Sequence, residues 1–155
     1  MSSAKVQTED FDVGVEMKQF QRAHRNIGAV TAFVGIVRDF SSNEKITEII
    51  IEHYPEMTEK TLTKIVQNAK KRWQIIDALV IHRIGKLLPF DQIVLVMVAS
   101  VHRKEAFSAC QFIVDYLKTQ APFWKKEVTS RGSYWVDARA SDDEALLRWR
   151  EKQTS

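Results

Sequence analysis

The segment at residues 100–127 constrains the fold of this chain more than any other, because it fixes a strand, a helix and an extended segment in succession. An apolar run at residues 92–99 predicts a strand, and this strand leads to His102 and Arg103. These two residues stand at the expected start of a helix. Free backbone N–H groups and the helix dipole favour an anion at that position.

The same segment places further cations at the other end of the helix. We expect the helix to end at Lys118, because Pro122 follows and favours an extended chain. That extended segment carries Lys125 and Lys126, which the strand period directs to opposite faces. The unit therefore collects cationic side chains with few acidic partners, and it predicts a site for a small, negatively charged molecule.

The length of 155 residues, with 45% hydrophobic and 28% charged residues, predicts one ordinary domain over residues 1–155. We expect residues 1–9 to be frayed and residues 150–155 to form a tail. No apolar run reaches the roughly 20 residues of a membrane helix, so no membrane association is expected. The single cysteine, Cys110, fits a reducing compartment and predicts a cytoplasmic protein. A net charge of +3 gives weak support for nucleic-acid binding.

Alternating apolar patterns predict an α+β fold with several antiparallel strands and no long series of βαβ units. The clearest helix has an apolar stripe that ends at Trp73. A final short helix is expected to be capped by Asp142 and to run through Trp149. The other expected elements are a helix at 13–23, strands at 29–37, 46–54, 75–84, 92–99 and 134–136, and a turn-like tract at 40–45.

Several kinds of chemistry are disfavoured by the residues themselves. The four histidines are scattered without metal-site spacing, so no metal site is expected. Cys110 falls on the apolar stripe of its helix, which favours a buried and inert thiol. Gly35 lies alone inside a strand and is typical of a bulge or a close approach, not of a phosphate-binding loop.

Lysine, arginine and histidine remain as candidates, and each has a simpler explanation. Lys118 is explained well by solvation at a helix C-terminus, and Arg38 by pairing with Asp39. His102 and Arg103 at a strand end are less typical of buried core residues. The residues alone predict an anion site and leave lysine catalysis open.

A resemblance adds to this reading. From Ala29 to Glu127 the chain resembles, in order and spacing, the large, catalytic subunits of molybdopterin synthase, the MoaE family. The last of the matching segments is specific, whereas the others are weak singly. They are Phe-Val-Gly-Ile-Val-Arg (33–38), Glu-His-Tyr-Pro-Glu-Met-Thr-Glu-Lys (52–60), Val-Ile-His-Arg-Ile-Gly (80–85), Ser-Val-His-Arg (100–103) and Asp-Tyr-Leu-Lys-Thr-Gln-Ala-Pro-Phe-Trp-Lys-Lys-Glu (115–127).

The resemblance implies a sulfurtransferase of molybdenum cofactor biosynthesis. Such an enzyme converts cyclic pyranopterin monophosphate into molybdopterin by installing the two sulfurs of a dithiolene. The sulfur arrives as a thiocarboxylate on the C-terminal Gly-Gly of a small ubiquitin-like partner, and no cofactor is implied. A homodimer of large subunits within a heterotetramer, and an α/β-hammerhead fold with an additional antiparallel β subdomain, are implied as well.

The resemblance also implies roles for particular residues. Lys118 and Lys125 match the family's catalytic lysines. The substrate-binding groups implied are Arg38, His102, Arg103, Lys126, Glu127 and, in the neighbouring protomer's site, Arg139.

Two positions depart from the family pattern, and two other functions stay open. Ile36 stands where many relatives have lysine, and Val101 replaces a residue that is often small. One rival function is a non-catalytic anion- or RNA-binding domain that uses Phe123 and Trp124 as stacking platforms. The other is a scaffold that has lost activity, which the presence of both lysines disfavours.

Overall fold

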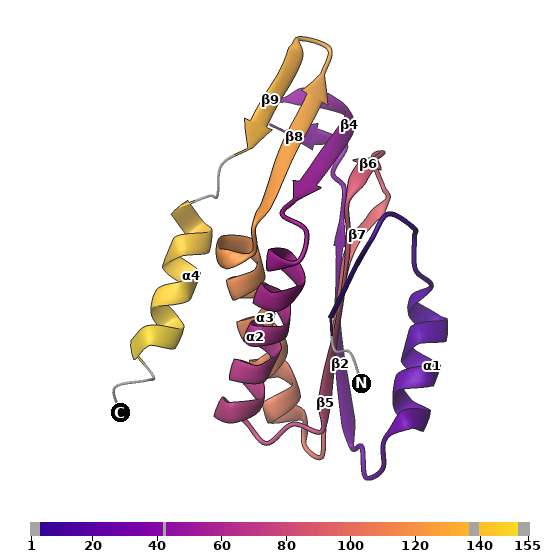
Figure 1. Ribbon diagram of the computed structural model, residues 1–155, viewed down its shortest axis with the longest axis vertical. Coiled ribbons are helices and arrows are strands. Elements are labelled where there is room, and N and C mark those ends of the chain that lie inside the picture. The colour runs from indigo at the N-terminus through magenta and orange to yellow at the C-terminus, as the bar shows by residue number, and fades with distance from the viewer. Residues whose placement is uncertain (1–3, 42, 137–139, 152–155) are drawn as a thin grey trace.

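The computed structural model describes residues 4–41, 43–136 and 140–151 (Figure 1). Its helices are α1 (Val13–Ala23), α2 (Met57–Arg72), α3 (Arg103–Gln120) and α4 (Ala140–Glu151). Its strands are β1 (Ala4–Gln7), β2 (Ala29–Ile36), β3 (Phe40–Ser41), β4 (Glu44–His53), β5 (Asp77–Arg83), β6 (Gly85–Leu87), β7 (Gln92–Ser100), β8 (Phe123–Thr129) and β9 (Gly132–Val136).

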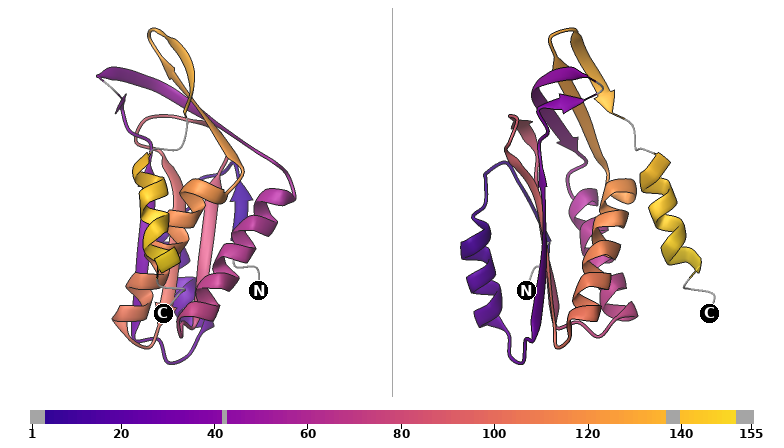
Figure 2. Two further views of the ribbon diagram at one scale, coloured as in Figure 1. Left: turned by 90° about the vertical axis from the view of Figure 1, so that its left-hand side faces the viewer. Right: turned by 180° about the vertical axis from the view of Figure 1, so that it is seen from behind.

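The first sheet has the strand order β1-β5-β7-β2 and carries helices on both faces. β1 pairs with β5 in parallel, whereas β5 with β7 and β7 with β2 are antiparallel. Figure 1 and the reverse view in Figure 2 show α1 on one face, α2 and α3 on the other, and α4 outside α3. Among the described residues, no helix is both long enough and apolar enough to cross a membrane.

The central position of β7 explains its unbroken apolar sequence. A strand that is covered on both faces buries every side chain, so it lacks the alternation of a half-exposed strand. Val96 and Val98 pack into the core under α2 and α3, and Leu95 and Met97 pack into the core under α1. All four side chains are fully buried.

The helices follow their apolar stripes. On α2, Leu62, Ile65, Val66 and Ala69 are buried, as the stripe predicts. The N-terminus of α1 is capped by Asp12, whose carboxylate accepts a hydrogen bond of 3.0 Å from the backbone N–H of Val15.

A second, antiparallel sheet lies beyond one end of the first and has the order β3-β4-β8-β9, with β6 paired to β4 (Figure 1). Its own small core contains Ile46, Ile49, Ile51 and Leu87, together with Val37 from the chain that leaves β2. This sheet is the additional β subdomain expected beside the α+β fold. Because β8 follows α3 directly, the subdomain stands over the C-terminal end of that helix.

Several sequence predictions need correction. The expected frayed segment at residues 1–9 contains β1, which is held by parallel pairing with β5. In the turn-like tract at 40–45, the described residues include strand pairs, because Phe40 pairs with Lys45 and Ser41 with Glu44. α3 continues two residues past Lys118, and α4 begins at Ala140, so Asp142 lies inside the helix instead of capping it. Short edge strands such as β1 and β3 owe their structure to a partner strand more than to their own pattern.

Candidate functional site

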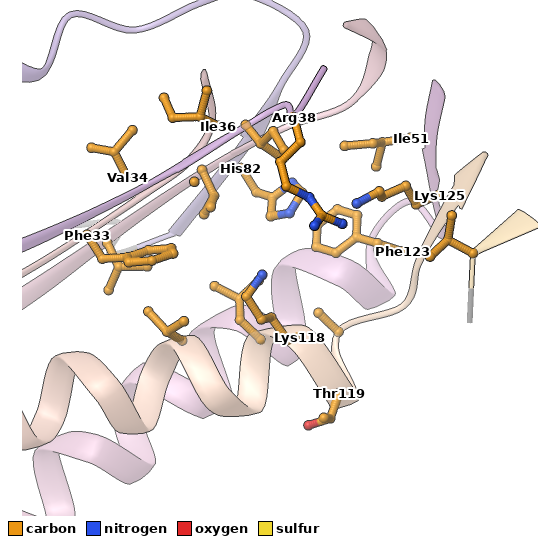
Figure 3. Close-up of a pocket in the computed structure, with 18 residues that line it drawn as sticks. Phe33, Val34, Ile36, Arg38, Ile51, His82, Lys118, Thr119, Phe123 and Lys125 are labelled. Atoms are coloured by element: carbon orange, nitrogen blue, oxygen red, sulfur yellow. The ribbon is translucent and has the colours of Figure 1, made fainter. Parts of the chain in front are cut away.

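A cavity of about 730 Å³ opens where the first sheet, the end of α3 and the β subdomain meet. Its walls come from β2, β4, β5, β7, α3, β8 and β9, so elements distant in sequence build one site. Figure 3 shows Arg38, Lys118 and Lys125 directing their nitrogen atoms into this space. The volume lies in the usual range for a small-molecule pocket.

Each cation reaches the pocket by a different route. Arg38 follows β2, and its neighbour Val37 is anchored in the subdomain core and donates a 2.9 Å backbone hydrogen bond to Asp91. Lys118 occupies the last turn of α3, where a cation complements the helix dipole. Lys125 comes from β8, on the face of that strand that lines the cavity.

The pocket is strongly cationic. None of the described residues that line it is an aspartate or a glutamate. Within the part of the chain that the structure describes, neither Arg38 nor Lys118 forms an ion pair. The expected pairing of Arg38 with Asp39 is therefore absent there. Cations that converge without a carboxylate suit an anionic ligand.

The two consecutive lysines of β8 point to opposite faces, as the strand period predicts. Lys125 lines the cavity, whereas the amino nitrogen of Lys126 lies 5.7 Å from the ring centroid of Trp135 on β9. Glu127 pairs with Tyr134 in the β8–β9 ladder and does not line the cavity.

His102 and Arg103 lie far from this pocket. They begin α3, whereas Lys118 is in its last turn, so roughly 22 Å of helix separates positions 103 and 118. Both side chains are exposed. One chain therefore does not bring these two residues together with Lys118. Arg139 lies outside the described residues.

Gly35 gives the pocket part of its shape. A Cβ atom at this position would lie 2.8 Å from Cγ1 of Val94 on the adjacent strand, which is closer than real side chains approach. The pairing of β2 with β7 also shifts register between Gly35 and Ile36. Both the bulge and the close approach that the sequence suggested are confirmed.

The pocket contains one functional candidate that sequence reasoning missed. His82 on β5 lines the cavity, is only 8% exposed and stacks on Phe123 with 3.8 Å between ring centroids. The pKa of His82 is lowered to about 4, chiefly by burial and to a smaller extent by the charge of Lys118. In the sequence, His82 is a histidine inside an apolar strand and within the matching segment at 80–85, and neither feature by itself indicates a role in the site.

Cys110 is buried between α3 and the sheet, as its place on the apolar stripe predicts. Burial raises the pKa of its thiol to about 12, so it remains protonated and unreactive at neutral pH. Among the described residues, no three His, Cys, Asp or Glu side chains lie close enough together to hold a metal ion.

Comparisons with known proteins give one consistent answer. The sequence profile of the family described as MoaE protein matches residues 6–120. A molybdopterin synthase catalytic subunit from Ralstonia nicotianae is 57% identical over 149 residues, covering 96% of this chain and 85% of the relative. The solved structure of a molybdopterin biosynthesis MoaE protein from Burkholderia ambifaria matches with a TM-score of 0.83 and 50% identity, covering 96% of this chain and 98% of that one. Molybdopterin synthase from Staphylococcus aureus matches with a TM-score of 0.80 and 31% identity, covering 88% and 98%.

Proposed function

Because this chain belongs to the MoaE protein family, we propose that it is the catalytic subunit of a molybdopterin synthase. It transfers sulfur from the C-terminal thiocarboxylate of a small ubiquitin-like subunit to cyclic pyranopterin monophosphate. Two such transfers form the dithiolene of molybdopterin, a step in molybdenum cofactor biosynthesis.

The observation that carries this proposal is the cationic pocket itself. Arg38, Lys118 and Lys125 line one cavity, and none of the described residues that line it is an aspartate or a glutamate. The substrate carries a phosphate and the partner's tail carries a thiocarboxylate, so both reactants are anions. A pocket that concentrates positive charge binds both and reduces the repulsion between them.

Each lining cation has a physical role in the proposal. The guanidinium of Arg38 binds the cyclic phosphate through paired hydrogen bonds. Lys118 lies beside the carbonyl of the thiocarboxylate, where its ammonium stabilises the oxyanion that develops during transfer or moves a proton. Lys125 neutralises charge on the departing phosphate oxygen.

The sulfur has to come from a partner. The only thiol of the chain, Cys110, is buried and protonated. The sulfur atom of the partner's thiocarboxylate attacks a carbon of the substrate and forms a thioester, while the bond from that carbon to an oxygen breaks and the oxygen leaves with the electron pair. Water then cleaves the bond between the acyl carbon and sulfur, which leaves sulfur on the substrate and a carboxylate on the partner. A Gly-Gly tail suits this pocket because glycine lets a backbone pass close to side chains.

His102 and Arg103 belong to the site only if a second copy of the chain supplies them. They lie roughly 22 Å along α3 from Lys118, too far to share one small substrate within a single chain. We therefore propose a homodimer in which each pocket receives these two residues from its neighbour, with one small subunit at each end. Lys126, Glu127 and Arg139 remain substrate-binding candidates on the resemblance alone.

Two further points concern the compartment of the protein and the rival RNA-binding function. We place the enzyme in the cytoplasm, where a lone cysteine stays reduced. A non-catalytic RNA-binding role has less support, because the face of Phe123 is occupied by His82 and a base cannot stack on that side.

Reconstitution tests the proposal. The protein is incubated with cyclic pyranopterin monophosphate and a thiocarboxylated ubiquitin-like partner, and dithiolene product is measured. We expect product with the thiocarboxylate and none with the matched carboxylate form of the partner. Product without a partner, or none with it, would contradict the proposed function.

A further inference from the structure

His82 presents one ring nitrogen to the pocket, and its surroundings fix which one. Its Nδ1 lies 2.7 Å from the backbone carbonyl oxygen of Arg83. A carbonyl oxygen only accepts hydrogen bonds, so Nδ1 carries the proton and donates it. In the neutral ring, Nε2 is then an unprotonated acceptor.

The acceptor nitrogen is open to the cavity. Within the described residues, Nε2 of His82 has no hydrogen-bond partner. The atom is not fully buried, so a ligand in the cavity can reach it. The ring is held by its stacking on Phe123, with an interplanar angle of 15°. Figure 3 shows the imidazole beside the ring of Phe123, with the amino nitrogen of Lys118 directed toward these two rings.

The charged side chains that line the pocket are donors. Arg38, Lys118 and Lys125 donate hydrogen bonds and cannot accept them while charged. The hydroxyl of Thr119 donates to the backbone carbonyl of Asp115 at 3.1 Å. His82 is thus a neutral acceptor that faces three charged donors.

We propose that Nε2 of His82 accepts a hydrogen bond from an N–H or O–H group of the pterin part of the bound substrate. This deepens the proposed function and rests on it. A phosphate offers acceptor oxygens, which the three cations satisfy. The donor groups of the substrate are on its ring system, so the acceptor orients the ring toward β5 while the phosphate faces the cations.

The charges around His82 keep it in the accepting form. Lys118 faces it from α3 and His53 from β4, and both disfavour a positive charge on the ring. Arg38, just after β2, and Lys125, on β8, line the same cavity. With its pKa lowered to about 4, chiefly by burial, His82 is neutral at pH 7.

Three substitutions separate the acceptor from the rest of the side chain. His82→Asn keeps an N–H for the Arg83 carbonyl but lacks the acceptor. His82→Phe keeps the stacking on Phe123 and also lacks it. His82→Gln can place its amide oxygen near the position of Nε2. His24→Asn is the control, because His24 pairs with Asp77 at 2.8 Å and does not line the pocket.

Equilibrium binding of cyclic pyranopterin monophosphate to the intact protein is measured by calorimetry, with inorganic phosphate as a second ligand. We expect His82→Asn and His82→Phe to bind the pterin roughly ten-fold more weakly, the effect of one lost hydrogen bond, and to bind phosphate as the wild type does. His82→Gln should recover part of the loss, and His24→Asn should show none. Circular dichroism spectra and melting temperatures identify any variant that fails to fold.

Nitrogen-15 NMR of the imidazole gives a reading independent of the variants. We expect free wild-type protein to show protonated Nδ1 and bare Nε2, and Nε2 to shift toward a hydrogen-bonded value when the pterin is added. A proton on Nε2, no shift with the pterin, or equal weakening for the pterin and for phosphate would overturn the proposal. Wild-type protein that binds the pterin but makes no product would instead refute the proposed function alone.

Discussion

The distance between the two ends of α3 leads to a sharp prediction about which chain supplies which residue. Lys118 and Arg103 lie roughly 22 Å apart on one helix, yet both are proposed to act on the same small substrate. In a homodimer with a two-fold axis, each pocket would combine Lys118 of one protomer with Arg103 of the other. Paired variants that are assembled into defined dimers test this arrangement.

The first pair joins a Lys118→Ala chain to an Arg103→Ala chain, co-expressed with different affinity tags and purified through both. One pocket of this dimer lacks both residues and the other has both. We therefore expect about half of the wild-type activity per dimer. Each homodimer should be far weaker, since losing one charged contact costs about 1.5–3 kcal/mol, or roughly 10- to 150-fold in kcat/KM.

The second pair is expected to give the opposite result, with little activity instead of half. A chain with both substitutions is joined to a wild-type chain, so that neither pocket keeps both residues if they come from different protomers. We expect little activity from this dimer. Sulfur transfer to cyclic pyranopterin monophosphate is measured below KM for both pairs. Half-activity in the second dimer and none in the first would refute the shared pocket.

Three further predictions concern single features of the site. Between pH 6.5 and about 4, the folded protein binds fewer protons at His82 than the unfolded chain does. The free energy of unfolding should therefore fall by on the order of 3 kcal/mol as the pH drops through this window. Chemical denaturation at several pH values measures this, and His82→Phe should remove that part of the slope. Arg38→Ala should raise KM roughly 10- to 100-fold with a smaller fall in kcat, because a phosphate contact is already made in the ground state; a collapsed kcat with an unchanged KM would overturn that role. Gly35→Ala should destabilise the protein by about 1–3 kcal/mol in urea titrations, since its Cβ would meet Val94 at 2.8 Å, and an unchanged midpoint would contradict this packing argument.

The parts of the fold that the sequence predicted are those whose pattern is set locally. The helix at residues 13–23 has the bounds of α1, because an Asp12 cap and an amphipathic face lie within its own sequence. The apolar run of β7 predicted a buried strand for the same reason. β1 and β6 were missed, because three or four residues become a strand only when a partner is available.

The same distinction between local pattern and tertiary packing applies to the residues of the candidate site. The sequence identified Lys118, Lys125 and Arg38, and the fold brings these three to one cavity. The sequence did not single out His82 on β5 as part of the wall, because its position there depends on packing between β5, β8 and α3. The separation of Arg103 from Lys118 could have been predicted from the sequence, because the two ends of an 18-residue helix lie far apart.

The central claim, that sulfur transfer takes place in this pocket and depends on Lys118, is tested most directly by single-turnover transfer from a thiocarboxylated partner. Lys118→Ala is compared with Lys64→Ala, which removes an exposed lysine from α2 that does not line the pocket. We expect Lys118→Ala to lose sulfur transfer by roughly 100-fold or more while it still binds the partner, as expected for a charge that stabilises a transition state. Lys64→Ala should transfer sulfur at the wild-type rate. Equal rates for the two variants would contradict the account.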